Sequence, residues 1–178
     1  ASRDELAEHF HVSTELLAKC PNLLVVSSNG AGYDTVDVDA CTKAGVLVVN
    51  QAGGNANAVA EHALGMILTL SKRVPQVDKA LRRNFPIDRT AYKGFEARDK
   101  TIGIIGFGRI GSTIGQTAAA VGMRIMACCL FRIPETIRII GGELLVMDDI
   151  IEKSDFITIH TPLTDETRGM INAEAFSR

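Results

Sequence analysis

A glycine pattern at residues 106–111 constrains the fold of this chain more than any other feature of its sequence. Gly106, Gly108 and Gly111 form a G-x-G-x-x-G motif directly after an apolar run and directly before a helical pattern. The first glycine of such a motif permits a tight turn, the second lets backbone amides approach a pyrophosphate, and the third lets the helix pack close to the strand. The helix N-terminus adds partial positive charge and N–H groups. The motif therefore predicts a dinucleotide-binding turn.

The rest of the chain alternates between apolar runs and helical patterns in the same way. Continuous apolarity is typical of strands that are buried on both faces, as in a parallel sheet. Strands are predicted over residues 23–28, 46–49, 101–105, 124–128, 144–146 and 156–160. Helices are predicted from a Ser13 cap to residue 20, from an Asp37 cap to Gly45, and over residues 57–83, 109–121, 134 onward and 148–153. This order predicts an α/β fold with a doubly wound parallel sheet of the Rossmann type.

The longest helical pattern, residues 57–83, carries an apolar stripe and one proline. The stripe is made of Val59, Ala63, Met66, Ile67 and Leu70. Pro75 has no backbone N–H and collides with the preceding turn of a helix, so we expect a break near Val74. A long helix with such a stripe could pack across a two-fold axis, which gives weak support for a dimer.

The residue after the strand at 124–128 bears on the choice of cofactor. A site for NAD normally has Asp or Glu there, which accepts hydrogen bonds from the adenosine ribose, but this chain has Cys129. Without a carboxylate nothing repels a 2′-phosphate, and Arg132 follows three residues later, where it could pair with one. Arg132 as a solvated loop residue is an equally good interpretation. The predicted cofactor is therefore NAD or NADP.

Charge and cysteine content limit the partners and the location. The net charge of −2, without long runs of like charge, favours neither nucleic acid nor an anionic membrane as a partner. No apolar run approaches the roughly 20 residues that span a bilayer. The four cysteines lack metal-ligand spacing, and we interpret them as reduced thiols of a cytoplasmic protein. No metal site is predicted.

Four stretches of the sequence resemble the D-isomer-specific 2-hydroxyacid dehydrogenase family, from about Pro21 to the end. They are residues 29–37 (NGAGYDTVD), 57–63 (NAVAEHA), 100–111 (KTIGIIGFGRIG) and 154–164 (SDFITIHTPLT). Residues 54–55 and 94–98 look most like the 3-phosphoglycerate dehydrogenase branch, with the glyoxylate or hydroxypyruvate reductases close behind. The resemblance implies an oxidoreductase that moves hydride between NAD(P) and a small D-2-hydroxy acid or its 2-oxo acid.

The resemblance also implies a two-domain enzyme whose parts this chain only partly contains. Residues 1–52 would belong to a flavodoxin-like substrate domain and residues 53–178 to the dinucleotide-binding domain. The family's catalytic Arg, Glu and His are expected beyond residue 178, so no catalytic residue is assigned. The sequence looks like the middle of a longer one. Members of the family form dimers, so the resemblance also implies a homodimer.

The loops at the carboxyl ends of the predicted strands are expected to meet in one crevice. The resemblance places Asn29, Gly30, Ala31 and Gly32 at the substrate carboxylate. For the cofactor, the resemblance and the motif together point to Ala31, Gly106, Gly108, Arg109, Ile110, Gly111, His160, Thr161 and Pro162. Cys129 and Arg132 join this set because of their position after the second strand of the cofactor domain.

Several residues also have other interpretations. His160 ends a strand at the ligand edge and could be an acid, but it matches a cofactor loop. His62 is better explained by packing, and Cys128 and Cys129 as small buried residues rather than reactive thiols. Asp148 and Asp149 are predicted to cap a helix N-terminus. A dinucleotide-sensing corepressor is the alternative function, whereas the loop at 29–32 argues against an adenosylhomocysteine hydrolase.

Overall fold

The computed structural model describes residues 7–83, 85–129 and 134–177. The chain divides into two compact units, Ala1–Asn55 and Ala56–Arg178. Each unit has its own sheet and its own apolar core. Within the described ranges, no helix is both long enough and apolar enough to cross a bilayer.

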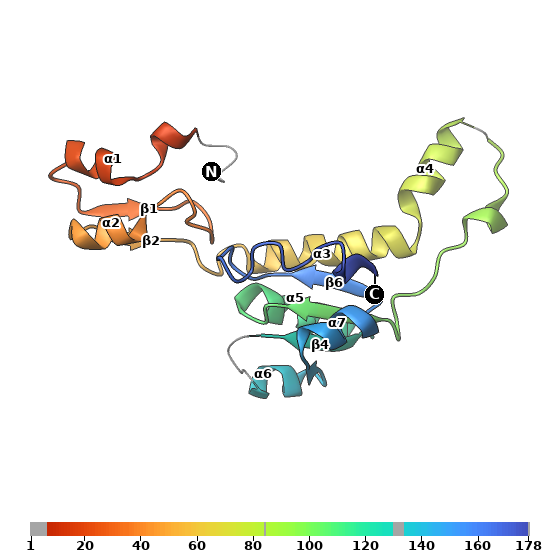
Figure 1. Ribbon diagram of the computed structural model, residues 1–178. Coiled ribbons are helices and arrows are strands. Elements are labelled where there is room, and N and C mark those ends of the chain that lie inside the picture. Colours follow the sequence, from red (N-terminus) through yellow and green to blue (C-terminus); the bar gives the residue numbers. More distant parts are fainter. Residues whose placement is uncertain (1–6, 84, 130–133, 178) are drawn as a thin grey trace. The chain divides into compact units, whose positions relative to one another are not determined.

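The first unit is a small β-α-β arrangement with one extra helix (Figure 1). After a 3-10 turn, Glu8–Phe10, its elements are α1 (Thr14–Lys19), β1 (Val25–Ser27), α2 (Val38–Lys43) and β2 (Leu47–Val49). The predicted caps are confirmed, since the Ser13 hydroxyl accepts from the Leu16 amide at 3.4 Å and the Asp37 carboxylate from the Ala40 amide at 2.8 Å. The two strands are parallel, with Val26 opposite Val48.

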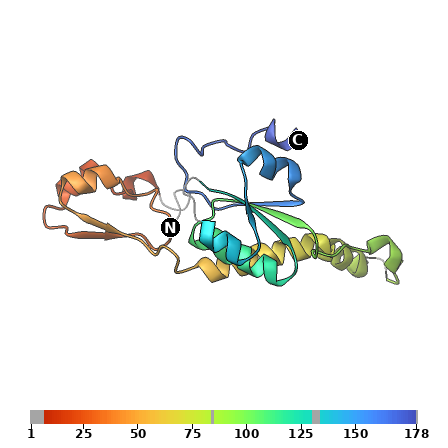
Figure 2. The same cartoon turned by 90° about the horizontal axis from the view of Figure 1, so that it is seen from below.

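The expectation that the strand at 23–28 is buried on both faces is wrong, and the neighbouring strand β2 is also exposed on one face. Val26 and Val48 pack against the core formed by Leu17, Ala40, Cys41 and Val46, but Val25 and Leu47 on the other face are exposed. The reason is that α1 and α2 lie on the same face of the sheet, as Figure 2 shows. Continuous apolarity therefore predicted the strands but not which of their faces would be covered.

The second unit contains a parallel sheet with the order β5-β4-β3-β6. Its elements are α3 (Ala56–Ser71), α4 (Val74–Arg83), a 3-10 turn (Arg89–Tyr92), β3 (Thr101–Ile105), α5 (Arg109–Ala120), β4 (Arg124–Cys128), α6 (Pro134–Ile139), β5 (Glu143–Leu144), α7 (Met147–Lys153), β6 (Phe156–Ile159) and a last 3-10 turn (Ala175–Ser177). The bounds of β3 and β4 agree with the prediction. The doubly wound parallel sheet is confirmed.

Helices cover both faces of this sheet. In Figure 2, α7 lies on one face, and α5 and α6 lie on the other with α3 beside α5. Every residue of β3 is buried, which places this strand at the centre of the core. A Cβ on Gly103 would lie 2.3 Å from Ser154 Oγ and 2.5 Å from Ile150 Cγ2. Glycine at this position therefore lets α7 approach the middle of the sheet.

The apolar stripe predicted for the long helix is only partly right. The buried positions of α3 are Ala56, Ala60, Ala63, Ile67 and Ser71. Ala63 and Ile67 belong to the predicted stripe, but Met66 and Leu70 are 52% and 60% exposed. Most of the buried residues of α3 are small, which allows its backbone to come close to α5, and Ile67 is the large apolar residue that is buried with them.

The predicted break in the long helix is confirmed. Helix α3 ends at Ser71, Arg73 adopts a left-handed φ of 55°, and α4 begins at Val74 with Pro75 in its first turn. Proline is tolerated there because the first amides of a helix have no intrahelical acceptor. The Arg73 guanidinium donates to the Ala91 carbonyl at 2.9 Å and so ties the junction to the following 3-10 turn.

The predicted cap of α7 is wrong. The N-cap residue is Val146, and no side-chain cap hydrogen bond is formed there. Asp148 and Asp149 lie in the first turn instead, where their charges favour the positive end of the helix dipole. The sequence pattern found the right turn but assigned the acidic residues a different role within it.

Candidate functional site

The glycine turn between β3 and α5 is packed directly against the chain that follows β6. Gly106 has a φ of 94°, and its amide donates to the Cys128 carbonyl at 2.8 Å. A Cβ on Gly106 would lie 2.7 Å from the carbonyl carbon and oxygen of His160. The His160 amide donates to the Ile105 carbonyl at 2.7 Å. Since β3 lies between β4 and β6, these two loops meet where the strand order reverses, the usual ligand position of open α/β sheets.

The three glycines of the motif differ in what requires them. A Cβ on Gly111 would lie 2.1 Å from the Gly106 carbonyl oxygen, so the close approach of α5 to the turn demands glycine. A Cβ on Gly108 would meet no heavy atom of the described residues within 4 Å, and its φ of −83° is open to any residue. Packing among the residues that the structure describes therefore explains Gly106 and Gly111 but not Gly108. A ligand that approaches the backbone would explain it.

The start of α5 suits an anion. Gly108 is the N-cap and offers no side-chain acceptor to the first amides, and the first turn contains no acidic residue. Arg109 is exposed and Ile110 half-buried in that turn. The positive end of the helix dipole and the open space at Gly108 together fit a pyrophosphate group.

The end of β4 carries two half-buried free thiols, Cys128 and Cys129. Cys128 is the last residue of the strand, and Cys129 packs against the main core. Burial, followed by the charge of the neighbouring Cys129, raises the pKa of the Cys128 thiol. Its thiolate is therefore disfavoured, which is the opposite of what a reactive cysteine needs. Arg132 lies outside the described residues.

The loop after β6 makes hydrogen bonds both with the strand that precedes it and with the segment that follows it. His160 is half-buried, and its Nε2 lies 2.6 Å from Thr158 Oγ1. Burial lowers the pKa of His160 below its usual 6.5, so the imidazole is neutral at neutral pH. Thr161 is half-buried, and the exposed Pro162 accepts at its carbonyl from the Thr167 hydroxyl at 2.7 Å.

The candidate substrate loop, residues 29–32, belongs to the first unit. Three successive carbonyls of this loop each accept a hydrogen bond, those of Gly30, Ala31 and Gly32. Two of the donors are side chains that sequence reasoning missed, Ser28 and Asn50. Each stands directly after a parallel strand, a position that could have drawn attention to them. That residues 29–32 meet the glycine turn of the second unit stays a prediction.

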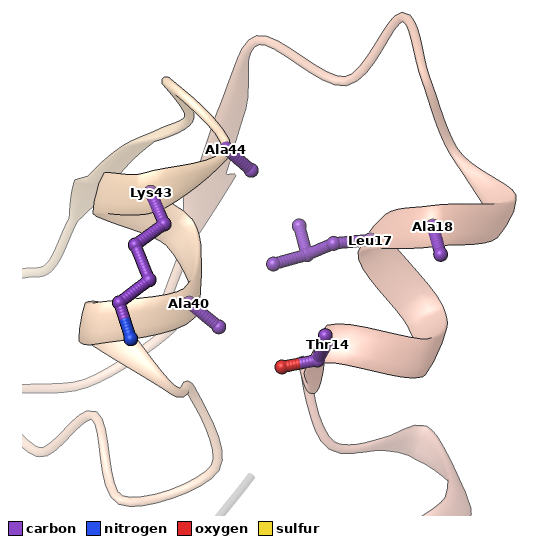
Figure 3. Close-up of a pocket in the computed structure, with 6 residues that line it drawn as sticks. All are labelled: Thr14, Leu17, Ala18, Ala40, Lys43 and Ala44. Carbon is purple, nitrogen blue, oxygen red and sulfur yellow. The ribbon is translucent and has the colours of Figure 1, made fainter.

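A hollow in the first unit is lined by residues outside this loop. It is a groove of about 330 Å³ between α1 and α2, and Figure 3 shows Leu17 of α1 facing Ala40 and Ala44 of α2. None of the predicted site residues that the structure describes lines it. Within the described residues, no group of three or more His, Cys, Asp or Glu side chains is arranged to hold a metal ion.

Comparison with known proteins gives consistent matches. Residues 64–178 match the family model described as D-isomer specific 2-hydroxyacid dehydrogenase, NAD binding domain. The D-3-phosphoglycerate dehydrogenase of Mycobacterium tuberculosis is 41% identical over 167 residues, which cover 94% of this chain and 31% of that protein. The chain thus spans less than a third of the length of this relative.

Two of the similar solved structures cover nearly all of this chain. The D-lactate dehydrogenase from Aquifex aeolicus, complexed with NAD and lactic acid, has a TM-score of 0.85 and 30% identity, covering 98% of this chain and 56% of that one. An acyclic imino acid reductase in complex with NADPH and D-Arg has a TM-score of 0.84 and 25% identity, covering 94% of this chain and 53% of that one.

Proposed function

The chain belongs to the D-isomer specific 2-hydroxyacid dehydrogenase family, and from this premise we propose that its protein transfers hydride between a nicotinamide dinucleotide and a small D-2-hydroxy acid. The observation that carries the proposal is the glycine turn at the sheet's switch point, where Gly108 is open although none of the described residues packs against it in a way that requires glycine.

The second unit would hold the cofactor along the carboxyl edge of its sheet. Gly106, Gly108, Arg109, Ile110 and Gly111 would surround the pyrophosphate, with α5 directing its positive end at the phosphates. Bound there, the cofactor would supply or take up hydride.

The adenosine end of the cofactor would lie beside Cys129 and the loop of His160, Thr161 and Pro162, and Ala31 of the first unit would approach it. A site for NAD normally has an Asp or Glu carboxylate at the position of Cys129, and that carboxylate would repel a 2′-phosphate. The thiol of Cys129 would not. We therefore propose that NADP is accepted as well as NAD. Arg132 remains a proposed contact of the 2′-phosphate.

The substrate would be held at its carboxylate by the loop of Asn29, Gly30, Ala31 and Gly32. Because the carbonyls of Gly30, Ala31 and Gly32 are all engaged within the first unit, the anion would meet the backbone amides of the loop. The relatives support a 2-hydroxy or 2-oxo acid, since one is a D-3-phosphoglycerate dehydrogenase and another was solved with lactic acid. No catalytic residue is assigned to this chain.

Two further parts of the proposal concern the assembly and the location. The exposed Met66 and Leu70 on α3 and Val74 on α4 support a homodimer formed through these helices. All four cysteines are free in the structure, which supports a reducing, cytoplasmic location.

Absorbance assays of the full-length enzyme test the proposal. NADH and NADPH are each offered with phosphohydroxypyruvate, hydroxypyruvate, glyoxylate and pyruvate. Oxidation with one of these acids is the expected result and would identify substrate and cofactor together. Binding of either cofactor without turnover of any acid would contradict the proposal and favour a dinucleotide sensor.

A further inference from the structure

The candidate substrate loop is fastened by an unusual set of hydrogen bonds that all end on its carbonyl oxygens. The Gln51 amide donates to the Gly30 carbonyl at 2.9 Å. The Asn50 side-chain amide donates to the Ala31 carbonyl at 2.7 Å, and the Ser28 hydroxyl donates to the Gly32 carbonyl at 2.6 Å. Three consecutive peptide groups are thus oriented from their acceptor side.

The donors come from the parallel strands that carry the loop. Ser28 and Asn50 are the first residues after β1 and β2, and the Ser28 amide bonds the Val49 carbonyl at 2.9 Å. The parallel hydrogen-bond pattern of β1 and β2 therefore continues for one more residue pair. It places the side chains of Ser28 and Asn50 at the carboxyl edge of the sheet. Asn50 spans 19 residues of sequence to reach Ala31 and is half-buried, so its position is determined by the fold and not by local turn chemistry.

The orientation of a peptide group links its two polar ends. A trans peptide is planar, so a carbonyl that is held on one side directs the N–H of the next residue to the opposite side. Holding the carbonyls of Gly30 and Ala31 therefore directs the amides of Ala31 and Gly32 away from Gln51 and Asn50. Within the described residues, neither amide donates a hydrogen bond to another protein group.

On the premise of the hydride-transfer function above, we propose that Asn50 is a positioning residue for the substrate carboxylate, acting through the Ala31 carbonyl, with Ser28 in the same role at Gly32. Asn50 does not touch the substrate. It keeps the peptide between Ala31 and Gly32 oriented, so that the amide of Gly32 is presented to an anion without a reorganisation cost. The substrate and the transition state carry the same carboxylate, so this orientation stabilises both equally. It therefore lowers the KM and leaves kcat unchanged.

Kinetics of the full-length Asn50→Asp variant test this role. The carboxylate has the shape of the amide but cannot donate to the Ala31 carbonyl. We expect the KM for the 2-oxo acid to rise about tenfold, with kcat and the dissociation constant for NADH nearly unchanged, as for the loss of uniform binding. Asn50→Ser, which restores a short hydroxyl donor, should recover part of the KM, and Ser28→Ala should raise it by about threefold.

Matched controls separate positioning from folding. Asn22→Asp makes the same change in an exposed turn of the same unit, and Ser27→Ala removes an exposed hydroxyl next to Ser28. Both should leave the KM unchanged. An unchanged KM in a folded Asn50→Asp variant would overturn the inference. A parallel loss of NADH affinity and thermal stability would also overturn it, because a structural defect would then explain the effect.

A binding measurement distinguishes failure of this inference from failure of the proposed function. Oxalate, a small dicarboxylate that cannot be reduced by hydride, is titrated calorimetrically into the full-length protein and into Asn50→Asp. Weaker oxalate binding by the variant supports the positioning role even if the wild type turns over no acid. Equal oxalate affinity of the two proteins overturns it, whatever the outcome of the turnover assays.

Discussion

At the scale of single residues, the glycines separate what the fold needs from what a ligand needs. Gly106 has a positive φ and touches the backbone of His160, and Gly111 touches the Gly106 carbonyl. The sequence motif predicted the tight turn at Gly106 and the close packing of α5 at Gly111, but it did not predict the contact of Gly106 with His160. Gly108 is different, since only the structure shows that a Cβ there would meet no atom of the described part of the chain.

Substituting Gly111 should therefore affect stability, whereas substituting Gly108 should affect cofactor binding. Gly111→Ala brings a methyl group against the Gly106 carbonyl, and we expect it to lower the free energy of unfolding by about 2 kcal/mol. Gly108→Ala should leave stability unchanged but weaken NADH binding about tenfold, because the methyl group obstructs the approach of the phosphates. Thermal unfolding and NADH fluorescence titration of both variants check this. Normal NADH binding by Gly108→Ala would contradict the proposed cofactor position.

The shifted pKa of His160 makes a second prediction. Burial lowers its pKa below 6.5, so below this pH the unfolded chain takes up a proton that folded His160 refuses. This effect costs nothing above pH 6.5 and removes stability as the pH falls from there toward the lowered pKa. His160→Gln should therefore unfold with a smaller stability difference between about pH 7.5 and about pH 5.5 than the wild type.

The comparison variant is His62→Gln, which makes the same substitution at an exposed position of α3. If His160→Gln keeps the wild-type pH dependence of stability, the burial effect at His160 is refuted. The same variant tests the assignment of His160 to a cofactor loop. Its kcat should stay within about threefold of the wild type, whereas loss of a catalytic acid typically costs on the order of a hundredfold or more.

At the scale of secondary structure, the sequence predicted the bounds of helices and strands better than it predicted which of their faces are buried. The bounds of β3 and β4, the caps of α1 and α2 and the break before Val74 were all readable, because each depends on neighbouring residues. The buried face of α3 was not, because it depends on α5, which comes from a distant part of the chain. The Asn50 contact with Ala31 was hidden for the same reason.

The close contact between α3 and α5 should be sensitive to side-chain volume. Ala60 is 1% exposed and lies in the main core, so Ala60→Leu would overpack it and lower the free energy of unfolding by about 2 kcal/mol. Ala58→Leu makes the same change at an exposed position two residues earlier and should be nearly neutral. Chemical denaturation of the two variants compares them directly. Equal stabilities would show that the helices can separate without cost.

At the scale of the whole molecule, the sequence supported the family and the α/β class because motif and alternation extend along most of the chain. What it could not predict is the surface left uncovered once each unit has formed its core. Ile67 is buried, whereas Met66 next to it is exposed, and hydrophobicity alone does not distinguish them. Uncovered apolar residues on one helix are typical of an interface between protein chains.

The proposed homodimer gives the last prediction. Met66 and Leu70 lie one turn apart on α3 and are both exposed, so a partner that covers them would remove apolar area from water. In the full-length protein, Met66→Glu together with Leu70→Glu would bury two charges in that contact, and we expect the sedimentation mass to fall from dimer to monomer. Ile139→Glu, at a residue of α6 that is 78% exposed, is the matched control and should remain dimeric. A double variant that sediments as a dimer would place the interface elsewhere, and a monomeric wild type would refute the homodimer.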